Sequence, residues 1–393
     1  MTGRKAMMKE IYLDNAATSW PKPREVPQAV TRALTKGGGN PGRSGHRMAI
    51  DAGRTVLACR ERLGELFSLD DPSHIIFTKN ATEALNIVLV GLLSGGGRVV
   101  TTTMEHNSVL RPLRHLSASG LVVDQAEADA EGRVVTDALV AKITAGTKLV
   151  AVTHGSNVTG AVNDLAAIVS RCREVGVPLL VDAAQTAGVV PIDLRLLPVD
   201  YLAFSGHKGL LGPQGTGALV VRDERGLPPL IRGGTGSLSD REDQPDFLPD
   251  RYESGTLNVP GIAGLSAGIG WLLRRGIDQV REHDQRLRHR LLDMLEGASG
   301  IKVYGTSRDG GAEGGFTGVV SVTLDRMSPS EAGELLERRF GILTRIGLHC
   351  APSAHRSIGT FPHGTVRLGW GPFTSEGDIV RAGRALLALA AGK

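Results

Sequence analysis

Residues 201–208 read Tyr-Leu-Ala-Phe-Ser-Gly-His-Lys, an apolar run that leads directly into a Ser-x-His-Lys turn. A second apolar run lies upstream and ends in the sequence Val-Asp-Ala-Ala-Gln at residues 181–185. Uninterrupted apolar runs are typical of strands that are buried on both faces, as in the parallel sheet of an α/β protein. Two such strands would deliver a carboxylate, Asp182, and an amine, Lys208, to the same edge of a sheet.

Lys208 and Asp182 together predict a site for pyridoxal 5'-phosphate. A lysine can hold the aldehyde of this cofactor as a Schiff base. An aspartate that faces the pyridinium nitrogen keeps it protonated, so the ring can act as an electron sink. By itself the Ser-x-His-Lys pattern is weak, because a surface turn also produces it. The Asp-x-x-Gln pattern upstream and a lone Cys350 far downstream favour the functional interpretation.

Apolar runs alternate with helical patterns from about residue 73 to residue 221, which predicts an α/β fold with a mostly parallel sheet flanked by helices. The expected strands are 74–77, 98–101, 121–123, 149–152, 178–181, 201–204 and 217–221. In such sheets, ligands bind at the carboxyl ends of the strands. The polar residues of interest fall just there: His106, Asn157, Asp182, Gln185, Ser205, His207 and Lys208.

The chain of 393 residues exceeds one typical domain of about 100–200 residues, so we expect two domains. Residues 1–262 would form a large cofactor-binding domain, with the N-terminal segment packing near the second domain. Residues 263–393 would form a linking helix and a smaller α+β domain. One long helix is expected from Gly261 to about Leu292. The expected elements after it are strands at 301–304, 319–324 and 365–368, and helices at 330–340 and 375–387.

The composition is ordinary for a soluble protein, with 41% hydrophobic and 22% charged residues, and argues against disorder. A net charge of +4 without a basic block does not indicate a nucleic-acid partner. Cys59, Cys172 and Cys350 lie far apart, so no metal site is expected, and such sparse cysteines fit a reducing compartment. Residues 1–10 lack an apolar core and residues 258–273 are too short to span a bilayer. We therefore expect a cytoplasmic protein without a membrane segment.

A dinucleotide cofactor is the obvious alternative for a glycine-rich α/β chain, with 52 glycines. However, Gly95-Gly96-Gly97 precedes an expected strand instead of opening a helix, and no G-x-G-x-x-G follows the first strand. The chain also lacks the G-x-x-x-x-G-K-[ST] pattern of nucleotide triphosphate sites. Both cofactor classes are therefore disfavoured.

Two further segments follow expected strands and suit the same cofactor. Asn80 and Glu83 resemble a helix capping box, and Ala81 and Thr82 offer a backbone amide and a hydroxyl to a phosphate at that helix N-terminus. A helix cap alone would explain the same pattern. His106 is placed where its ring could stack on a flat cofactor and move protons near it.

Cys350 lies in a loop-like segment rich in glycine and proline, whereas most lone cysteines are small core residues. Arg345 and His349 are near enough in sequence to favour its thiolate form. Arg367 ends a short strand pattern, and its guanidinium could bind a substrate carboxylate through two parallel bonds. The residue pattern alone leaves this role of Arg367 open.

The motifs together resemble those of the cysteine desulfurases of the class V aminotransferase fold, in the same order and from Ile11 to about Leu387. The Gly-x-His-Cys-Ala form at Cys350 is similar to the group II branch, which includes selenocysteine lyases. The matching segments are residues 12–18, 80–83, 105–107, 156–160, 181–185, 205–208, 255–256 and 349–351. The polar stretch between Cys350 and Arg367, with His355, Arg356 and His363, departs from this branch.

The resemblance implies a fold type I enzyme that binds pyridoxal 5'-phosphate and forms a homodimer. Lys208 would hold the cofactor, Asp182 would face its ring nitrogen, Gln185 would donate to its ring hydroxyl and His106 would stack on it. The resemblance implies phosphate contacts from Ala81, Thr82, Ser205 and His207, and from Thr256 of the second subunit.

The resemblance also implies a reaction in which L-cysteine becomes L-alanine and Cys350, the nucleophile, keeps the sulfur as a persulfide for an acceptor protein. The substrate-binding residues would be Ala17, Asn157, Arg345 and Arg367. Two other activities stay open from the sequence. One is a selenocysteine lyase, and the other is a class V epimerase or lyase that does not use Cys350.

Overall fold

The structure is a computed structural model that describes residues 10–42, 44–224, 226–305 and 315–392. Its larger sheet has the strand order β2-β8-β7-β6-β5-β3-β4. These strands are β2 (Ile75–Thr78), β3 (Gly97–Thr102), β4 (Leu121–Ala126), β5 (Leu149–Thr153), β6 (Leu179–Asp182), β7 (Tyr201–Ser205) and β8 (Gly217–Val221). All seven predicted strands are present, and β8 runs antiparallel to both neighbours while the other pairs are parallel. The predicted α/β class is confirmed.

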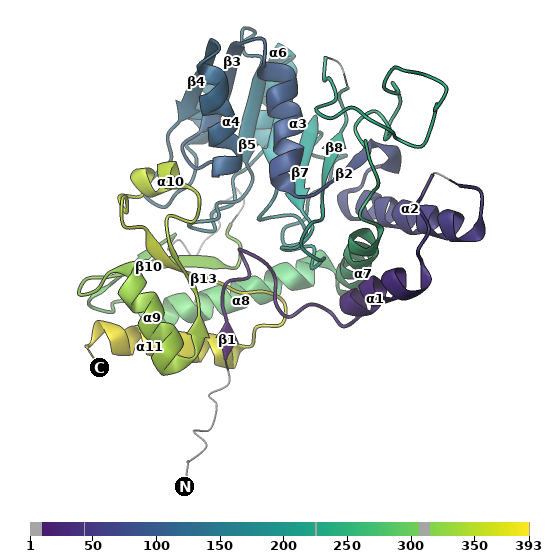
Figure 1. Cartoon of the computed structure of the whole chain (residues 1–393). Coiled ribbons are helices and arrows are strands. Elements are labelled where there is room, and N and C mark those ends of the chain that lie inside the picture. The colour runs from purple at the N-terminus through teal and green to yellow at the C-terminus, as the bar shows by residue number, and fades with distance from the viewer. Residues whose placement is uncertain (1–9, 43, 225, 306–314, 393) are drawn as a thin grey trace.

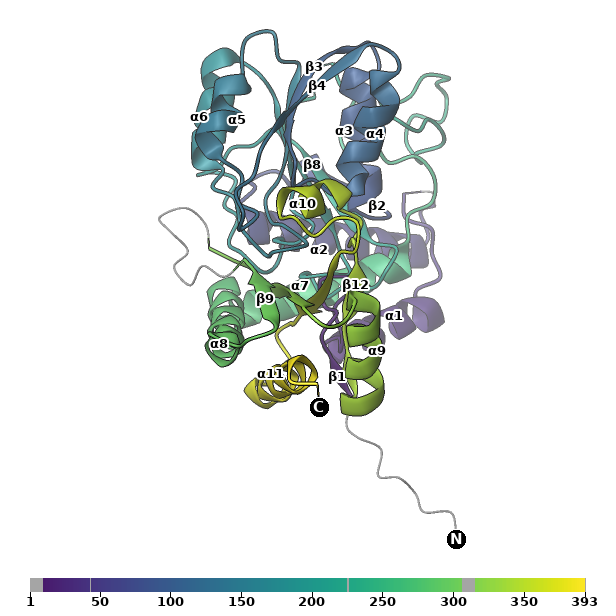
Figure 2. The ribbon, with the colours of Figure 1, turned by 90° about the vertical axis from the view of Figure 1, so that its left-hand side faces the viewer.

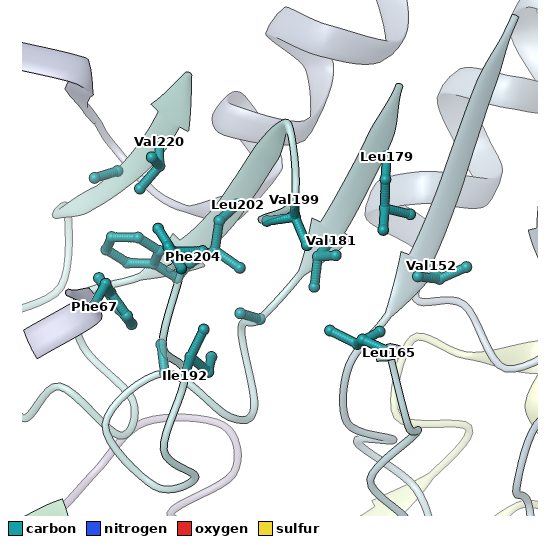
Figure 3. Close-up of a cluster of buried hydrophobic side chains, with 14 of the residues drawn as sticks. Phe67, Val152, Leu165, Leu179, Val181, Ile192, Val199, Leu202, Phe204 and Val220 are labelled. Carbon is teal, nitrogen blue, oxygen red and sulfur yellow. The ribbon is translucent and has the colours of Figure 1, made fainter. Parts of the chain in front are cut away.

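Apolar side chains on both faces hold this sheet between two helical layers. Alternate residues of a strand point to opposite faces, so Val181 and Leu202 join one cluster, whereas Leu180 and Ala203 join the other. Figure 3 shows part of the first cluster, in which the Phe67 and Phe204 rings lie 5.0 Å apart. The helices that cover the sheet are α2 (Arg47–Phe67), α3 (Ala81–Leu93), α4 (Asn107–Ser117), α5 (Thr136–Lys142) and α6 (Ala166–Val175). Figure 2 shows α3 and α4 on one side of the sheet and α5 and α6 on the other.

A second, antiparallel sheet has the order β12-β13-β10-β9 and lies below the first in Figure 1. Its strands are β9 (Ile301–Tyr304), β10 (Val319–Leu324), β12 (Arg345–Gly347) and β13 (Thr365–Gly369). Helices α8 (Ile277–Leu295), α9 (Pro329–Phe340) and α11 (Glu376–Ala390) cover it. Outside the two sheets and these helices lie β1 (Ile11–Tyr12), which pairs with β11 (Ile342–Leu343), and α1 (Glu25–Lys36), η1 (Pro72–His74) and α10 (Pro352–Ser357), together with one further helix described next.

The prediction of one long helix after Gly261 is wrong. The chain forms α7 (Val259–Arg275) and then α8, and Gly276 between them has φ of +83°. Glycine adopts this backbone conformation without the steric cost that a side chain brings. Helix α7 packs on α1 and α2, whereas α8 packs on α11. The predicted domain boundary at residues 262/263 falls inside α7, and the division into domains stays a prediction.

Asp284 of α8 is a buried carboxyl beside a cavity of about 40 Å³, which Asn15, Lys208 and Trp370 also line. Among the described residues its Oδ1 has no hydrogen-bond partner. Burial raises the pKa of Asp284 to about 8. A charged carboxylate is costly in such surroundings, so the folded protein keeps this group neutral at neutral pH.

We expect the Asp284→Asn variant to gain stability relative to the wild type as the pH rises. Between about pH 4 and the folded pKa, the unfolded chain releases the Asp284 proton and the folded chain retains it. Wild-type stability therefore falls over this range by up to about 1.4 kcal/mol per pH unit from this group. Urea unfolding of both proteins at about pH 5.5 and pH 7.5 measures this contribution. If the free energies of unfolding of the two proteins differ by the same amount at both pH values, Asp284 does not have a raised pKa in the folded protein.

Among the described residues, no helix is long and apolar enough to cross a membrane.

Candidate active site

The carboxyl ends of the large sheet's strands surround a cavity of about 210 Å³. Strands β5, β6 and β7 run parallel, so the residues that follow them meet at one edge. The predicted residues that line this cavity are Ala81, Thr82, His106, Asn157, Asp182, Gln185, Ser205, His207 and Lys208. The structure thus brings together nine of the predicted positions from five separate segments of the chain.

Lys208 lies in the turn after β7, in the wall of this cavity. Burial lowers the pKa of Lys208 to about 8, and the nearby carboxylate of Asp182 opposes part of this shift. The positive charges of Arg367 and Arg345 lower it further. An amine with a pKa near neutrality exists partly as the free base, which is the form that attacks an aldehyde and accepts a proton.

Asp182 ends β6 and is buried. Its Oδ1 accepts the backbone N–H of Ala184 at 2.9 Å, and burial raises the pKa of its carboxyl. A second buried carboxyl belongs to Glu105. Burial raises the pKa of Glu105 to about 8, and the nearby charge of Asp182 adds to this increase. Glu105 Oε1 accepts the Thr102 hydroxyl at 2.7 Å and the Thr153 N–H at 2.9 Å. The sequence pattern gave no role to Glu105, which fixes the loop next to the strand that carries Asp182.

His106 precedes α4, and its Nδ1 accepts the backbone N–H of Ser108 at 3.0 Å. This bond assigns the ring hydrogen of the neutral imidazole to Nε2. Burial lowers the pKa of His106 to about 4, with a further contribution from the charge of Lys208. The ring is therefore neutral and held in one orientation, which suits stacking on a flat aromatic ligand.

The N-terminus of α3 lines the other end of the cavity. Asn80 caps this helix by accepting the Glu83 N–H at 3.0 Å, as predicted, whereas the Glu83 carboxylate accepts the N–H of Lys79 instead of Asn80. The N–H of Ala81 donates to the Ser205 hydroxyl at 3.1 Å, and the Thr82 and Ser108 hydroxyls lie 2.9 Å apart. A helix N-terminus is a general site for anions, and hydroxyl groups beside it can also donate to an anion.

His207 adds one more polar atom to this end of the cavity. Its Nδ1 is buried and has no partner among the described residues. Burial lowers the pKa of His207 to about 4, so the ring is neutral. An orphaned buried nitrogen beside several hydroxyl and amide donors fits a phosphate, which offers several acceptor oxygens.

Gln185 lines the cavity and contacts the N-terminal segment, whereas Ala17 of that segment is not among the lining residues. Gln185 Nε2 donates to the carbonyl oxygen of Ala16 at 3.0 Å, which uses one of its two amide hydrogens. The backbone N–H of Ala17 donates to Asp14 O at 3.0 Å. The Ala17 amide is therefore engaged within its own segment.

Cys350 is exposed and lies between β12 and α10. Arg345 Nη2 lies 3.4 Å from its sulfur, so Arg345, which was predicted to bind substrate, contacts the thiol. Two bonds tie this segment to the large sheet's loops: Asn107 N–H to Cys350 O at 2.8 Å, and Asn157 Nδ2 to His349 O at 2.6 Å. His349 and Cys350 have φ of +48° and +59°, an uncommon backbone conformation for residues with side chains.

The prediction that His349 helps to favour the thiolate by its charge is wrong. The His349 ring is buried, bonded through Nε2 to the Thr365 hydroxyl at 2.9 Å, and burial lowers its pKa to about 2. The fully buried His355 ring lies 5.3 Å from it, and burial lowers the pKa of His355 to about 4. Both rings are neutral, so among the residues that the structure describes it is Arg345 that brings a positive charge into contact with the Cys350 sulfur.

Arg367, in β13, is only 1% exposed. Its Nη1 donates to Asn157 O at 2.9 Å, and its Nη2 lies 2.8 Å from Asp14 Oδ1. The first of these contacts places Arg367 next to the predicted substrate-binding residue Asn157. The sequence pattern gave no role to Asp14, because a partner that lies 353 positions away leaves no local trace.

Thr256 lies outside this group. It is exposed and lines a separate cavity with Lys79 and Asn258, and its hydroxyl accepts from Asn40 Nδ2 at 3.4 Å. Within the described ranges, no group of three or more histidine, cysteine, aspartate or glutamate side chains is arranged to hold a metal ion.

Comparison with known proteins agrees with this architecture. Residues 11–381 match the family described as Aminotransferase class-V. The chain is 34% identical over 383 residues to a probable cysteine desulfurase of Methanothermobacter thermautotrophicus, a match that covers 96% of this chain and 94% of the relative. It is 31% identical to a cysteine desulfurase of Yersinia pestis, over 87% of this chain and 84% of the relative.

Solved structures give the same result. An apo cysteine desulfurase from Thermococcus onnurineus matches with a TM-score of 0.89 and 33% identity, covering 98% of this chain and 95% of that one. A cysteine desulfurase from Escherichia coli matches with a TM-score of 0.85 and 27% identity over the same shares. The chain therefore belongs to the class V aminotransferase family, within the cysteine desulfurase group.

Proposed function

We propose that this protein is a pyridoxal 5'-phosphate-dependent cysteine desulfurase that converts L-cysteine to L-alanine and keeps the sulfur as a persulfide on Cys350. The observation that carries the proposal is the pairing of Lys208 in the cavity with an exposed thiol nearby. The Cys350 carbonyl accepts the N–H of Asn107 at 2.8 Å, and Asn107 directly follows His106, which lines the same cavity as Lys208. The names of the relatives support the same activity.

The residues around the cavity fit this cofactor. Lys208 would hold its aldehyde, Asp182 would face the ring nitrogen, and the neutral His106 ring would stack on it. Gln185 keeps one amide hydrogen for the ring hydroxyl. The phosphate would bind to Ala81, Thr82, Ser205 and His207. The buried Nδ1 of His207, which has no partner among the described residues, supports this position of the phosphate. When bound, the cofactor stabilises negative charge at the substrate Cα.

The protein's own groups then account for the remaining chemistry. Asn157 and Arg367 would hold the substrate carboxylate near the backbone of Ala17. Lys208 is placed to take the Cα proton and return it, because its lowered pKa suits both roles. The Cys350 thiolate attacks the substrate sulfur, so an S–S bond forms as the Cβ–S bond breaks. The organic product is alanine after protonation.

Incubation of the purified yellow protein with L-cysteine tests the proposal. We expect alanine to form, with one persulfide per active site in the first turnover and sulfide once a thiol reductant is added. A selenocysteine lyase would produce alanine from selenocysteine but almost none from cysteine. An epimerase or another lyase would produce D-cysteine or pyruvate instead, and either result would contradict the proposal.

We further propose that the protein is a cytoplasmic homodimer that passes its persulfide sulfur to an acceptor protein. Thr256 supports the dimer, because it is exposed and away from its own cavity, as a residue that serves the partner's phosphate would be. Helices α1 and α2 also carry the exposed apolar side chains Leu34, Met48, Ile50 and Leu57, which an interface with a second subunit would cover.

A complementation experiment tests the placement of Thr256. We expect that a heterodimer of one Lys208→Ala subunit and one Thr256→Ala subunit, purified through two tags, retains one site with wild-type cofactor affinity. If Thr256 instead served its own subunit, the only site with Lys208 would carry the Thr256 change. Weakened cofactor binding at the one site that retains Lys208 would therefore contradict a role of Thr256 in the partner's site. An active monomer by light scattering would contradict it as well.

A further inference from the structure

The N-terminal strap, which we define as residues 14–22, runs from the small sheet to the turn that carries Lys208. At its start, Asp14 forms a bridge with Gly369 at the end of β13. At its end, Lys22 contacts the backbone of His207. In between, the carbonyl of Ala16 accepts the side-chain amide of Gln185. The strap thus contacts the small sheet at one end and, at the other end, the turn of the large sheet that carries Lys208.

The Lys22 end of the strap surrounds the carbonyl oxygen of His207 with donors. Lys22 Nζ lies 2.9 Å from this oxygen, and the N–H and hydroxyl of Ser19 lie 3.0 and 3.1 Å from it. The Thr18 hydroxyl is a fourth donor at 3.2 Å. A carbonyl oxygen has two lone pairs, so it is more than satisfied. This carbonyl belongs to the peptide unit that continues into Lys208.

Lys22 is an unusual choice for packing alone. It is half-buried, and in the parts of the chain that the structure describes it forms no ion pair. Its partners are neutral oxygens, those of His207 and of the Ser19 hydroxyl at 2.6 Å. Removing an ammonium from water without a carboxylate partner costs free energy. This cost offsets part of what the two hydrogen bonds contribute to stability, so the charge-assisted bond to the His207 carbonyl is better explained by a role in orienting that peptide.

The Asp14 end acts on Arg367 in a comparable way. Asp14 Oδ1 and Asn157 O accept from the two terminal nitrogens of Arg367, which fixes the plane of the guanidinium. Arg367 Nε is buried and has no partner among the described residues. By its charge alone, Asp14 opposes the binding of a substrate carboxylate to Arg367. Its presence there is therefore better explained by orientation than by electrostatic attraction.

We propose that the strap positions two reactive groups independently, with Asp14 orienting Arg367 toward the substrate carboxylate and Lys22 orienting the peptide that carries Lys208. The inference rests on the proposed roles of Lys208 and Arg367. Because each end contacts a different group, the two ends have separable effects. Loss of Asp14 changes substrate binding, and loss of Lys22 changes how Lys208 holds the cofactor.

The Lys22 end is tested by adding pyridoxal 5'-phosphate to apo protein and following its visible band. In Lys22→Met we expect the band to appear about tenfold more slowly, since a misplaced nucleophile reacts more slowly. The pH midpoint of the band should also shift, because the Lys208 nitrogen would be held in a different position relative to its neighbours. Lys22→Arg, which retains a cationic donor, should recover most of both values. Lys36→Met, an exposed lysine on α1, is the control.

A purely structural role for Lys22 would lower the thermal midpoint of the protein and leave the rate and the pH midpoint of the band unchanged. That outcome overturns the inference for this end. The proposed function fails differently, because it fails if Lys208→Ala keeps a protein-linked band. The two failures are therefore distinguishable.

The Asp14 end is tested with two variants that remove the same charge. Asp14→Asn keeps an oxygen that can accept from Arg367, whereas Asp14→Ala does not. We expect the KM for L-cysteine to rise about tenfold in Asp14→Ala and to stay near wild type in Asp14→Asn, with the cofactor band unchanged in both. A role through charge alone predicts that both variants lower the KM. That result, or an unchanged KM in Asp14→Ala, overturns the inference for this end.

Discussion

Lys208→Ala is expected to lack the visible absorption band that borohydride bleaches in the wild-type protein. The band requires a covalent bond between the cofactor aldehyde and an amine, and alanine cannot supply one. In the cavity described above, Lys208 is the one lysine among the lining residues. We also expect desulfuration to fall by several orders of magnitude, because the variant loses the group that takes the Cα proton. Spectra before and after borohydride, followed by mass analysis of the protein, measure the first effect.

Lys302→Ala is the matched control for this experiment. Lys302 is an exposed lysine on β9 of the small sheet and lines neither the candidate site nor the cavity that contains Thr256. Its removal should leave both the band and the borohydride adduct intact. A protein-linked, borohydride-reducible chromophore in Lys208→Ala would show that another amine holds the cofactor, and the assignment of the cavity would be lost.

Cys350→Ala is expected to bind L-cysteine at the cofactor like the wild type and to release almost no alanine from it. Sulfur bound to carbon leaves poorly unless a nucleophile attacks it, and the thiolate is that nucleophile. We expect alanine release in a single turnover to fall by roughly two orders of magnitude or more. The measurement compares both proteins after cyanide treatment, which clears persulfide left from earlier turnovers.

Cys172→Ala provides the control, since burial raises the pKa of the Cys172 thiol to about 12 and leaves it unreactive. Because selenium leaves carbon more easily than sulfur, part of the activity toward selenocysteine should survive in Cys350→Ala. Equal alanine release from Cys350→Ala and the wild type would make Cys350 a packing residue. The chain would then fit an epimerase or lyase better.

The large sheet and the group of residues at its edge were predictable because both leave local patterns in the sequence. Apolar runs such as residues 149–152 mark buried strands, and the polar residues directly after them must meet at one edge. The break at Gly276 was missed because the helical patterns on its two sides join smoothly, and only packing on different partners separates α7 from α8.

Contacts between distant parts of the chain explain the other gaps. His349 was expected to be charged because it is adjacent to Cys350 in sequence, yet burial against Thr365 makes it neutral. The roles of Asp14 and Lys22 depend on partners that lie 353 and 185 positions away, respectively. Neither residue belongs to a pattern that sequence spacing alone could connect to Arg367 or His207.

The pairing of the N-terminal strap with the last part of the chain has a consequence for biosynthesis. Strand β1 pairs with β11, and Asp14 contacts Arg367, so β1 and the Asp14 side chain lack these partners until the C-terminal part of the chain has been made. Contacts of such high sequence separation form late in folding. The nascent large sheet can therefore assemble early, but the finished catalytic centre requires the whole polypeptide. A chain cut short before residue 342 would have no means to complete it.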